Sequence, residues 1–199
     1  VWTTRDERED TLVKVFHQSA QRGEAPFLIP LGASTAVGAV GYVEAMKELA
    51  NHGHAFDWIV MASSSGGTQA GMVLGAEMTQ WKGRILGISI DHSVEELQLT
   101  VSSLANEAAV LLKENTRFTT EQILVNADYL GGGYAVAGSA EVEAIKLFGK
   151  SEGLLLDPVY TGRAAAGMMD LIRKGFFKKT DRVLFWHTGG APALFAPPY

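Results

Sequence analysis

Short apolar segments that alternate with helix-length amphipathic segments constrain the fold of this chain more than any other feature. The apolar runs are Trp58 to Met61, Arg84 to Ile90 and Val183 to His187. Strands that are apolar throughout are buried on both faces, and strands separated by helices of ten or more residues pair in parallel. We therefore expect a doubly wound, three-layer α/β domain with a mostly parallel sheet.

Apolar periodicity, N-cap residues and terminal glycines predict the helices. The expected helices cover residues 6–22, 36–52, 93–114, 139–150 and 161–174, and another follows residues 63–71 and reaches about residue 81. We expect the stretch from Pro26 to Pro30 to be extended and the tail from Pro192 to Tyr199 to be irregular.

Composition favours a globular protein that binds a small ligand. A chain of 199 residues with 47% hydrophobic residues can bury a sizeable core. Its net charge of -5 argues against nucleic-acid binding, which rewards clustered Lys and Arg. No apolar run is long enough for a membrane span, and the lack of cysteine makes a reducing cytoplasm the expected compartment. The start at Val1 indicates a chain that begins inside a longer parent.

The segment from Ser63 to Gly71 is a candidate phosphate-binding loop. It lies between a predicted buried strand and a predicted helix, where ligands of open α/β sheets bind. Gly66 and Gly67 allow close approach of the backbone, and Thr68 and the serines add hydroxyl donors. The alternative is a Ser/Gly-rich turn with an ordinary N-cap. The segment is neither a P-loop nor a dinucleotide fingerprint, so a single phosphate monoester fits it better than a nucleotide.

Three further segments carry a resemblance to a known family: residues 131–134 (GGGY), 157–162 (DPVYTG) and 187–194 (HTGGAPAL). With the 63–71 loop and the 32–34 turn, the chain resembles the family of D-cysteine desulfhydrase and 1-aminocyclopropane-1-carboxylate deaminase. These are fold-type-II pyridoxal-phosphate enzymes with a tryptophan synthase β-like fold. The resemblance implies pyridoxal 5'-phosphate as cofactor, a small amino-acid substrate and a homodimer.

The resemblance also implies roles for individual residues. Tyr134 and Tyr160 correspond to two active-site tyrosines, which orient a substrate carboxylate or transfer a proton. The alternative for each is an aromatic side chain that anchors a loop. The implied cofactor-binding residues are Ser65, Gly66, Gly67, Thr68, Thr161 and Thr188. His187 is interpreted as structural, and the other histidines lack carboxylate or histidine partners at metal-ligand spacing, so no metal site is expected.

Thr161 and Thr188 stand where the two branches of the family differ. Members that resemble the deaminase carry Glu and Leu there, and members that resemble the desulfhydrase carry Thr at both. The expected reaction is therefore α,β-elimination on a D-cysteine-like amino acid to give pyruvate, ammonia and sulfide. Aminocyclopropane carboxylate deaminase and cysteate sulfo-lyase are the alternatives. Thr161 could instead cap the following helix, and Thr188 a strand end.

The sequence shows no recognisable Schiff-base lysine, because the lysines fall on polar helix faces or at helix ends. In the family this lysine lies in the N-terminal part, together with the small lid domain. We expect residues 1–27 to be a remnant of the small domain and residues 28–199 to be the large cofactor-binding domain, inactive alone. A non-catalytic phosphate- or pyridoxal-phosphate-binding module is the alternative of another class. A third hypothesis, a nucleotide-dependent oxidoreductase, is supported only by the alternation of strands and helices.

Overall fold

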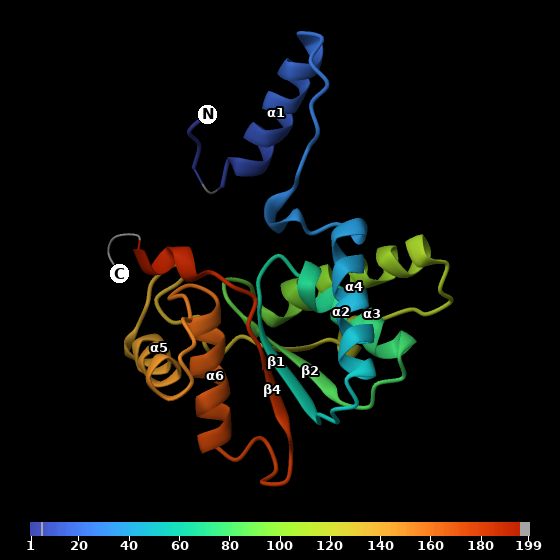
Figure 1. Ribbon diagram of the computed structural model, residues 1–199. Coiled ribbons are helices and arrows are strands. Elements are labelled where there is room, and N and C mark those ends of the chain that lie inside the picture. Colours follow the sequence, from blue (N-terminus) through green and yellow to red (C-terminus); the bar gives the residue numbers. More distant parts are fainter. Residues whose placement is uncertain (5, 196–199) are drawn as a thin grey trace. The chain divides into compact units, whose positions relative to one another are not determined.

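The computed structural model describes residues 1–4 and 6–195 and divides the chain into two compact units, Val1–Ala33 and Ser34–Tyr199 (Figure 1). The first unit contains helix α1 (Arg8–Gln21) and a short 3-10 helix (Leu31–Ala33), joined by a stretch without regular secondary structure. The second unit contains the sheet. The predicted domain boundary between residues 27 and 28 stays a prediction.

The second unit is built on a four-stranded parallel sheet with the order β3-β2-β1-β4. The central strand β1 aligns Ile59 with Ile85 of β2 and with Leu184 of β4. Strand β3 was not predicted, because it is short and only half-buried. The strands are β1 (Trp58–Ser63), β2 (Arg84–Ser89), β3 (Leu124–Asn126) and β4 (Val183–Trp186). The predicted α/β fold with a parallel sheet is confirmed.

The predicted helices are present, with ends that shift by a few residues. The largest shift is in α3, which begins at Gly67, within the predicted loop of residues 63–71, and ends at Met78 instead of near residue 81. A 3-10 helix (Ala191–Phe195) occupies part of the tail predicted to be irregular, and residues 196–199 lie outside the described part. The helices of this unit are α2 (Ala36–Asn51), α3 (Gly67–Met78), α4 (Val94–Leu112), α5 (Ser139–Ser151), α6 (Thr161–Arg173) and the 3-10 helix Thr120–Gln122.

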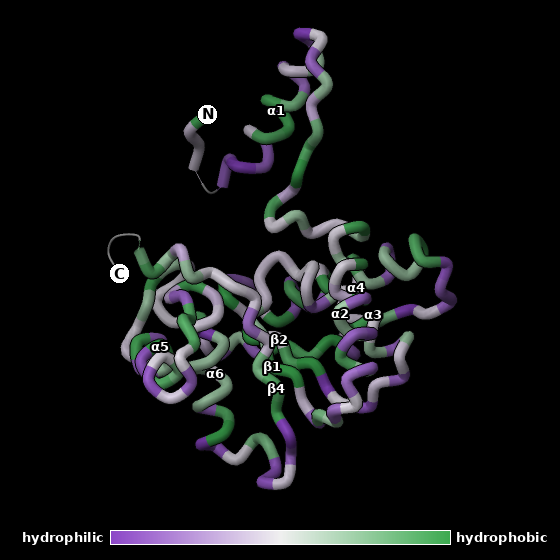
Figure 2. The backbone as a smooth tube through the Cα atoms, in the orientation of Figure 1, coloured by the Kyte–Doolittle hydropathy of each residue, from purple (hydrophilic) through white to green (hydrophobic). Residues whose placement is uncertain are grey.

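Helices cover both faces of the sheet because the side chains of β1 alternate between the faces. Ile59 and Met61 pack in one cluster with residues of α2 and α3, including Met46. Val60 packs in another cluster with residues of α6, including Ala164. Figure 2 shows the apolar residues concentrated on the strands. This arrangement gives the three layers that the sequence predicted.

Helices α2 and α3 approach each other to backbone contact. A Cβ atom added to Gly71 of α3 would lie 2.0 Å from the carbonyl oxygen of Ala39 in α2. The same atom on Gly75 would lie 2.7 Å from the Cβ of Met46. Glycine at these positions therefore sets the helix spacing and brings the start of α2 beside the start of α3.

Replacing Gly71 with alanine is expected to destabilise the chain by about 2 kcal/mol or more, because the added methyl group meets backbone that cannot move without separating the helices. Gly41 of α2 is the matched control, since a Cβ there meets nothing within 4 Å. Gly41→Ala is expected to stabilise by about 0.5–1 kcal/mol through helix propensity. Urea unfolding of both variants measures the difference. Equal free energies of unfolding would contradict the close approach.

Candidate functional site

Four segments meet at the carboxyl edge of the parallel sheet, where open α/β sheets bind ligands. They follow β1, β2 and β4 and precede α6. Three of them, the segments after β1 and β4 and the one before α6, enclose a cavity of about 130 Å³ lined by Ala62, Ser63, Ser64, Ser65, Gly66, Thr68, Tyr160 and Thr188. The structure thus brings together five predicted site residues from distant parts of the sequence: Ser65, Gly66, Thr68, Tyr160 and Thr188.

The loop after β1 opens α3 with glycines in positions that exclude larger residues. Gly66 has a left-handed backbone with a φ of 80°, and a Cβ on Gly67 would lie 2.7 Å from the Oγ of Ser34. No side chain caps the N-terminus of α3. The N-cap position is Gly66, so no N-cap side chain accepts from the first-turn N–H groups, which can donate to a ligand, and the phosphate-binding role of the loop stays a prediction.

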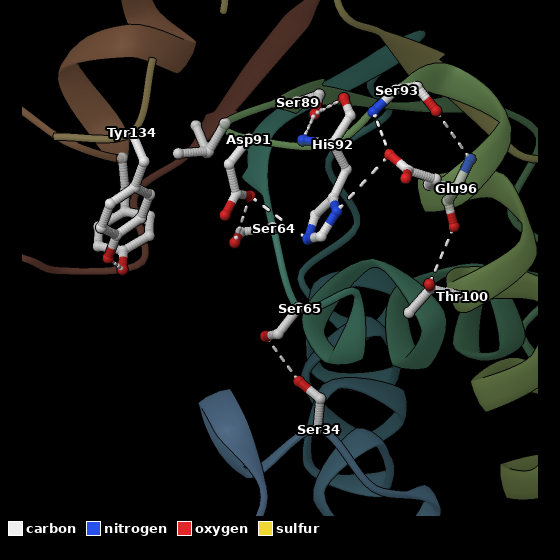
Figure 3. Close-up of polar contacts among 12 residues, drawn as sticks. Ser34, Ser64, Ser65, Ser89, Asp91, His92, Ser93, Glu96, Thr100 and Tyr134 are labelled. Carbon is white, nitrogen blue, oxygen red and sulfur yellow. Dashed lines mark hydrogen bonds and ion pairs between the residues drawn. The ribbon is translucent and has the colours of Figure 1, made fainter. Parts of the chain in front are cut away.

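The three consecutive serines of this loop differ in their partners (Figure 3). The Ser64 hydroxyl donates to Oδ1 of Asp91 at 2.8 Å. Ser65 accepts from the hydroxyl of Ser34 at 2.7 Å, which leaves its own proton available to a ligand. Ser63 is 3% exposed, and its hydroxyl has no hydrogen-bond partner among the described residues.

Tyr134 and Tyr160 form a pair at the site. Their hydroxyls are hydrogen-bonded, and their rings meet edge to face with centroids 6.0 Å apart. Burial raises the pKa of Tyr160, and the hydrogen bond between its hydroxyl and that of Tyr134 raises it further. The negative charges of Asp91 and Asp157 act in the same direction. Tyr160 is therefore a protonated phenol at neutral pH and can donate a hydrogen bond or a proton.

Asp157 holds the loop that carries Tyr160. Its buried carboxylate accepts the N–H groups of Val159, Tyr160 and Thr161 at 2.7 to 2.8 Å. The Thr161 hydroxyl also donates to Asp157, at 2.7 Å, and accepts the Asp157 N–H at 3.0 Å. Asp157, and not Thr161, therefore caps the start of α6. Thr161 is fully buried and already donates its proton to this carboxylate, so its contact with a cofactor stays a prediction.

Thr188 and its neighbour His187 follow β4. Thr188 is exposed and lines the cavity. His187 Nδ1 accepts the N–H of Gly189 at 3.0 Å, so the ring proton is on Nε2, which donates to the carbonyl of Leu155 at 3.1 Å. His187 thus ties two loops together, as its structural interpretation predicted.

A buried ion pair supports the segment that carries Tyr134. Arg163 of α6 is fully buried and pairs with Glu141 of α5 at 2.9 Å. Its other nitrogens donate to the carbonyls of Ile90 and Val136. Arg163 was not predicted as a site residue. The available signal was a single arginine in an otherwise small and apolar stretch of α6.

His92 has carboxylate neighbours, contrary to the expectation from the sequence. Its ring nitrogens lie 3.5 Å from Asp91 and 3.9 Å from Glu96. Within residues 1–4 and 6–195, no group of three or more His, Cys, Asp or Glu side chains could hold a metal ion. In the same part of the chain, no helix is long and apolar enough to cross a membrane.

Comparison with known proteins identifies the family. The family model described as "Pyridoxal-phosphate dependent enzyme" matches residues 1–189. The chain belongs to this family. The family prediction and its cofactor dependence are therefore confirmed at this level. The crystal structure of a 1-aminocyclopropane-1-carboxylate (ACC) deaminase homologue is 34% identical, with a TM-score of 0.85 over 95% of this chain.

Two more distant solved structures share the fold. The crystal structure of O-ureido-L-serine synthase is 12% identical with a TM-score of 0.55 over 90% of this chain. The processed form of threonine deaminase isoform 2 from Solanum lycopersicum is 14% identical with a TM-score of 0.53 over 87%. The chain spans 57%, 54% and 48% of these three proteins, respectively.

The loop and cavity fit the phosphate group of pyridoxal phosphate. Ser63 lines the cavity, and its buried hydroxyl has no partner among the described residues, which costs about 1–3 kcal/mol. The N–H groups in the first turn of α3 also require a hydrogen-bond acceptor, because no N-cap side chain accepts from them. A phosphate monoester supplies oxygen acceptors for both. Ser63 was not singled out from the sequence, although the change from apolar residues to serine at the end of β1 was the available signal.

The cavity accounts for part of a cofactor site. Its volume of about 130 Å³ is below the roughly 300–1,000 Å³ of typical ligand pockets. None of its lining residues is a lysine. Both observations agree with a chain that covers about half of the related proteins.

Ser63→Ala is expected to change stability and ligand binding in opposite directions. Removing an unpartnered buried hydroxyl should leave the free energy of unfolding equal or raise it by up to about 1 kcal/mol. Loss of a donor to phosphate should weaken binding of pyridoxine 5'-phosphate by about tenfold. Calorimetric titration and urea unfolding measure the two effects. Ser151→Ala, which removes a surface hydroxyl bonded to Leu147, is the control for both. An unchanged affinity of Ser63→Ala for pyridoxine 5'-phosphate would show that Ser63 does not bind the phosphate.

Proposed function

We propose that the chain is the large-domain part of a pyridoxal-phosphate-dependent lyase that performs α,β-elimination on a D-cysteine-like amino acid. The products are pyruvate, ammonia and sulfide. One observation carries the proposal: the phosphate cradle with the unpartnered Ser63 hydroxyl shares one cavity with Tyr160. A cofactor anchor and a proton donor therefore lie side by side.

Some residues of this chain hold the cofactor phosphate, and others donate or orient a proton. Ser63, Ser65 and the first-turn N–H groups of α3 hold the cofactor phosphate, with Thr68 at the same wall. When bound, the cofactor supplies an electron sink for the charge that develops at the substrate α-carbon. Tyr160, held protonated, donates its proton to the departing β-substituent, and Tyr134 orients the Tyr160 hydroxyl through their hydrogen bond.

Thr188 supports the desulfhydrase branch over the deaminase branch. Its hydroxyl lies at the cavity wall, where it can donate to a neutral ring nitrogen. Thr161 gives weaker support, because its proton is already donated to Asp157. The relative titled an ACC deaminase homologue supports the other branch at 34% identity. Aminocyclopropane carboxylate and cysteate therefore remain alternative substrates.

The rest of the catalytic machinery is assigned to a longer protein. This chain spans only about half of the length of the related structures. We place the Schiff-base lysine and most of the small lid domain in that additional part, with residues 1–27 as the remnant of the lid and residues 28–199 as the large domain. A homodimer in the cytoplasm completes the proposal.

An assay of the longer protein tests the reaction. The protein encoded together with its upstream sequence is supplied with D-cysteine, aminocyclopropane carboxylate or cysteate, and sulfide, sulfite and ammonia are measured. Sulfide and ammonia in equal amounts from D-cysteine are expected. Ammonia from aminocyclopropane carboxylate with no sulfide from D-cysteine would contradict the branch assignment. Tyr160→Phe should lower kcat by about 100-fold, the usual contribution of a positioned proton donor.

A non-catalytic cofactor-binding module is the second candidate. It is favoured by a cavity that has phosphate donors but no lysine in its wall. The upstream coding sequence separates the two candidates. A reading frame that encodes a lid domain with a lysine supports the lyase, and a reading frame that starts at Val1 supports the binding module.

A further inference from the structure

Asp91 is a nearly buried carboxylate at the edge of the candidate site. It lies just beyond the end of β2, the strand next to β1, and its side chain is 7% exposed. Its Oδ1 accepts the hydroxyl of Ser64 at 2.8 Å, so it holds the middle serine of the phosphate loop (Figure 3). Burial of a carboxylate is costly, and such a group is kept where it has a specific role or partner.

The segment after β2 is itself firmly anchored, so Asp91 is a rigid support. Ser89 donates to the carbonyl of His92 at 2.7 Å and accepts its N–H at 3.1 Å. Ser93 and Glu96 form a reciprocal capping box at the start of α4. Asp91 lies within the first of these anchors, between Ser89 and His92, with His92 as an ion-pair neighbour when the imidazole is protonated.

The bond to Asp91 also decides what Ser64 can do. A hydroxyl has one proton, and the Ser64 proton is donated to the carboxylate. Ser64 therefore lines the cavity without a proton to offer, whereas Ser63 and Ser65 keep theirs. Ser63 and Ser65 can therefore donate to a ligand, whereas Ser64 anchors the loop to Asp91.

We propose that Asp91 is a positioning residue of this site, which fixes the phosphate loop through Ser64 and keeps a negative charge beside the Tyr134 and Tyr160 pair. The inference rests on the proposed function for its ligand. The electrostatic part does not depend on that ligand, and in the view of Figure 3 Asp91 lies between Tyr134 and His92. Asp91, Asp157 and Tyr134 are the groups that act on the Tyr160 hydroxyl, and the charge of Asp91 raises the pKa of Tyr160.

Two variants of Asp91 separate the hydrogen bond from the charge. In Asp91→Asn the amide oxygen still accepts from Ser64, but the charge is gone. In Asp91→Ala both are lost. Pyridoxine 5'-phosphate is the probe, because it carries the phosphate but cannot react with surface lysines. Asp91→Ala and Ser64→Ala should each weaken its binding about fivefold to tenfold, and Asp91→Asn should not weaken it. Glu95→Gln, an exposed charge loss in the first turn of α4, is the control.

Tyrosine ionisation provides a readout that a purely structural role would not change. The chain is labelled with 3-fluorotyrosine, which ionises at lower pH, and the ¹⁹F signal of residue 160 is assigned with Tyr160→Phe. Asp91→Asn should lower the ionisation midpoint of this signal by roughly half a unit to one unit, because a nearby negative charge favours the neutral phenol. Glu95→Gln should leave the midpoint unchanged.

The outcomes distinguish this inference from the proposed function. If the unaltered chain fails to bind pyridoxine 5'-phosphate, the proposed function fails, and the tyrosine titration still decides the role of Asp91. If the chain binds the probe but Asp91→Ala binds it equally well, the loop-fixing role is wrong. An unchanged midpoint in Asp91→Asn would overturn the electrostatic role.

Discussion

Asp157→Ala is expected to lower the free energy of unfolding by about 3–5 kcal/mol, because it leaves several buried donors without an acceptor. The carboxylate accepts three backbone N–H groups and the hydroxyl of Thr161. Asp157 is itself fully buried, so water cannot replace it without opening the loop. Urea unfolding measures the loss, and near-ultraviolet circular dichroism reports the environment of Tyr160.

Two controls make the Asp157 result specific. Asp157→Asn keeps one oxygen acceptor, so it should be less destabilising than the alanine variant. Asp128→Ala removes a carboxylate whose hydrogen bond from the Asn126 amide is exposed, and it should cost less than about 0.5 kcal/mol. If Asp157→Ala is no worse than Asp128→Ala, the loop before α6 is not held by Asp157.

Arg163→Met is expected to be as severe, with a loss of about 3–5 kcal/mol, because it leaves the buried carboxylate of Glu141 without its partner. It also removes the donors to the carbonyls of Ile90 and Val136. The segment that carries Tyr134 loses its support, so binding and catalysis by any longer protein should fall together with stability. Thermal and urea unfolding measure the effect.

Arg173→Met is a matched control in the same helix. Arg173 pairs with Glu143, also across α5 and α6, but both side chains are more than half exposed. A surface pair of this kind contributes about 1 kcal/mol or less. The double variant Arg163→Met with Glu141→Leu should recover part of the loss, because it removes the unpaired charge. A similar small effect for Arg163→Met and Arg173→Met would contradict the role of the buried pair.

The fold was largely predictable because its elements are marked by local patterns. The apolar runs at β1, β2 and β4 and the periodic segments at α2 and α4 correspond to the observed elements. Strand β3 carries no such mark, since its three residues are half-buried and include Asn126. Its place is set by parallel pairing with β2, which is a tertiary interaction.

The site was predictable in its location but not in its internal bonding. The glycines and serines after β1 indicate a phosphate loop through local sequence alone. The contacts that decide which serine is free join residues 27 to 31 positions apart. The same holds for Arg163, whose partners lie 22 to 73 positions away. Only the folded chain shows that the Thr161 hydroxyl bonds to Asp157 and that the Ser63 hydroxyl has no hydrogen-bond partner in the described part of the chain.

Calorimetric titration of this chain with pyridoxine 5'-phosphate and with pyridoxine tests the central claim most directly. If the loop that follows β1 anchors the cofactor phosphate, the phosphate ester binds with one-to-one stoichiometry, and pyridoxine binds at least tenfold more weakly. Ser63→Ala then reduces the difference between the two ligands. Equal affinity for the two ligands, or no binding of the phosphate ester by the folded chain, would contradict a phosphate anchor at this loop.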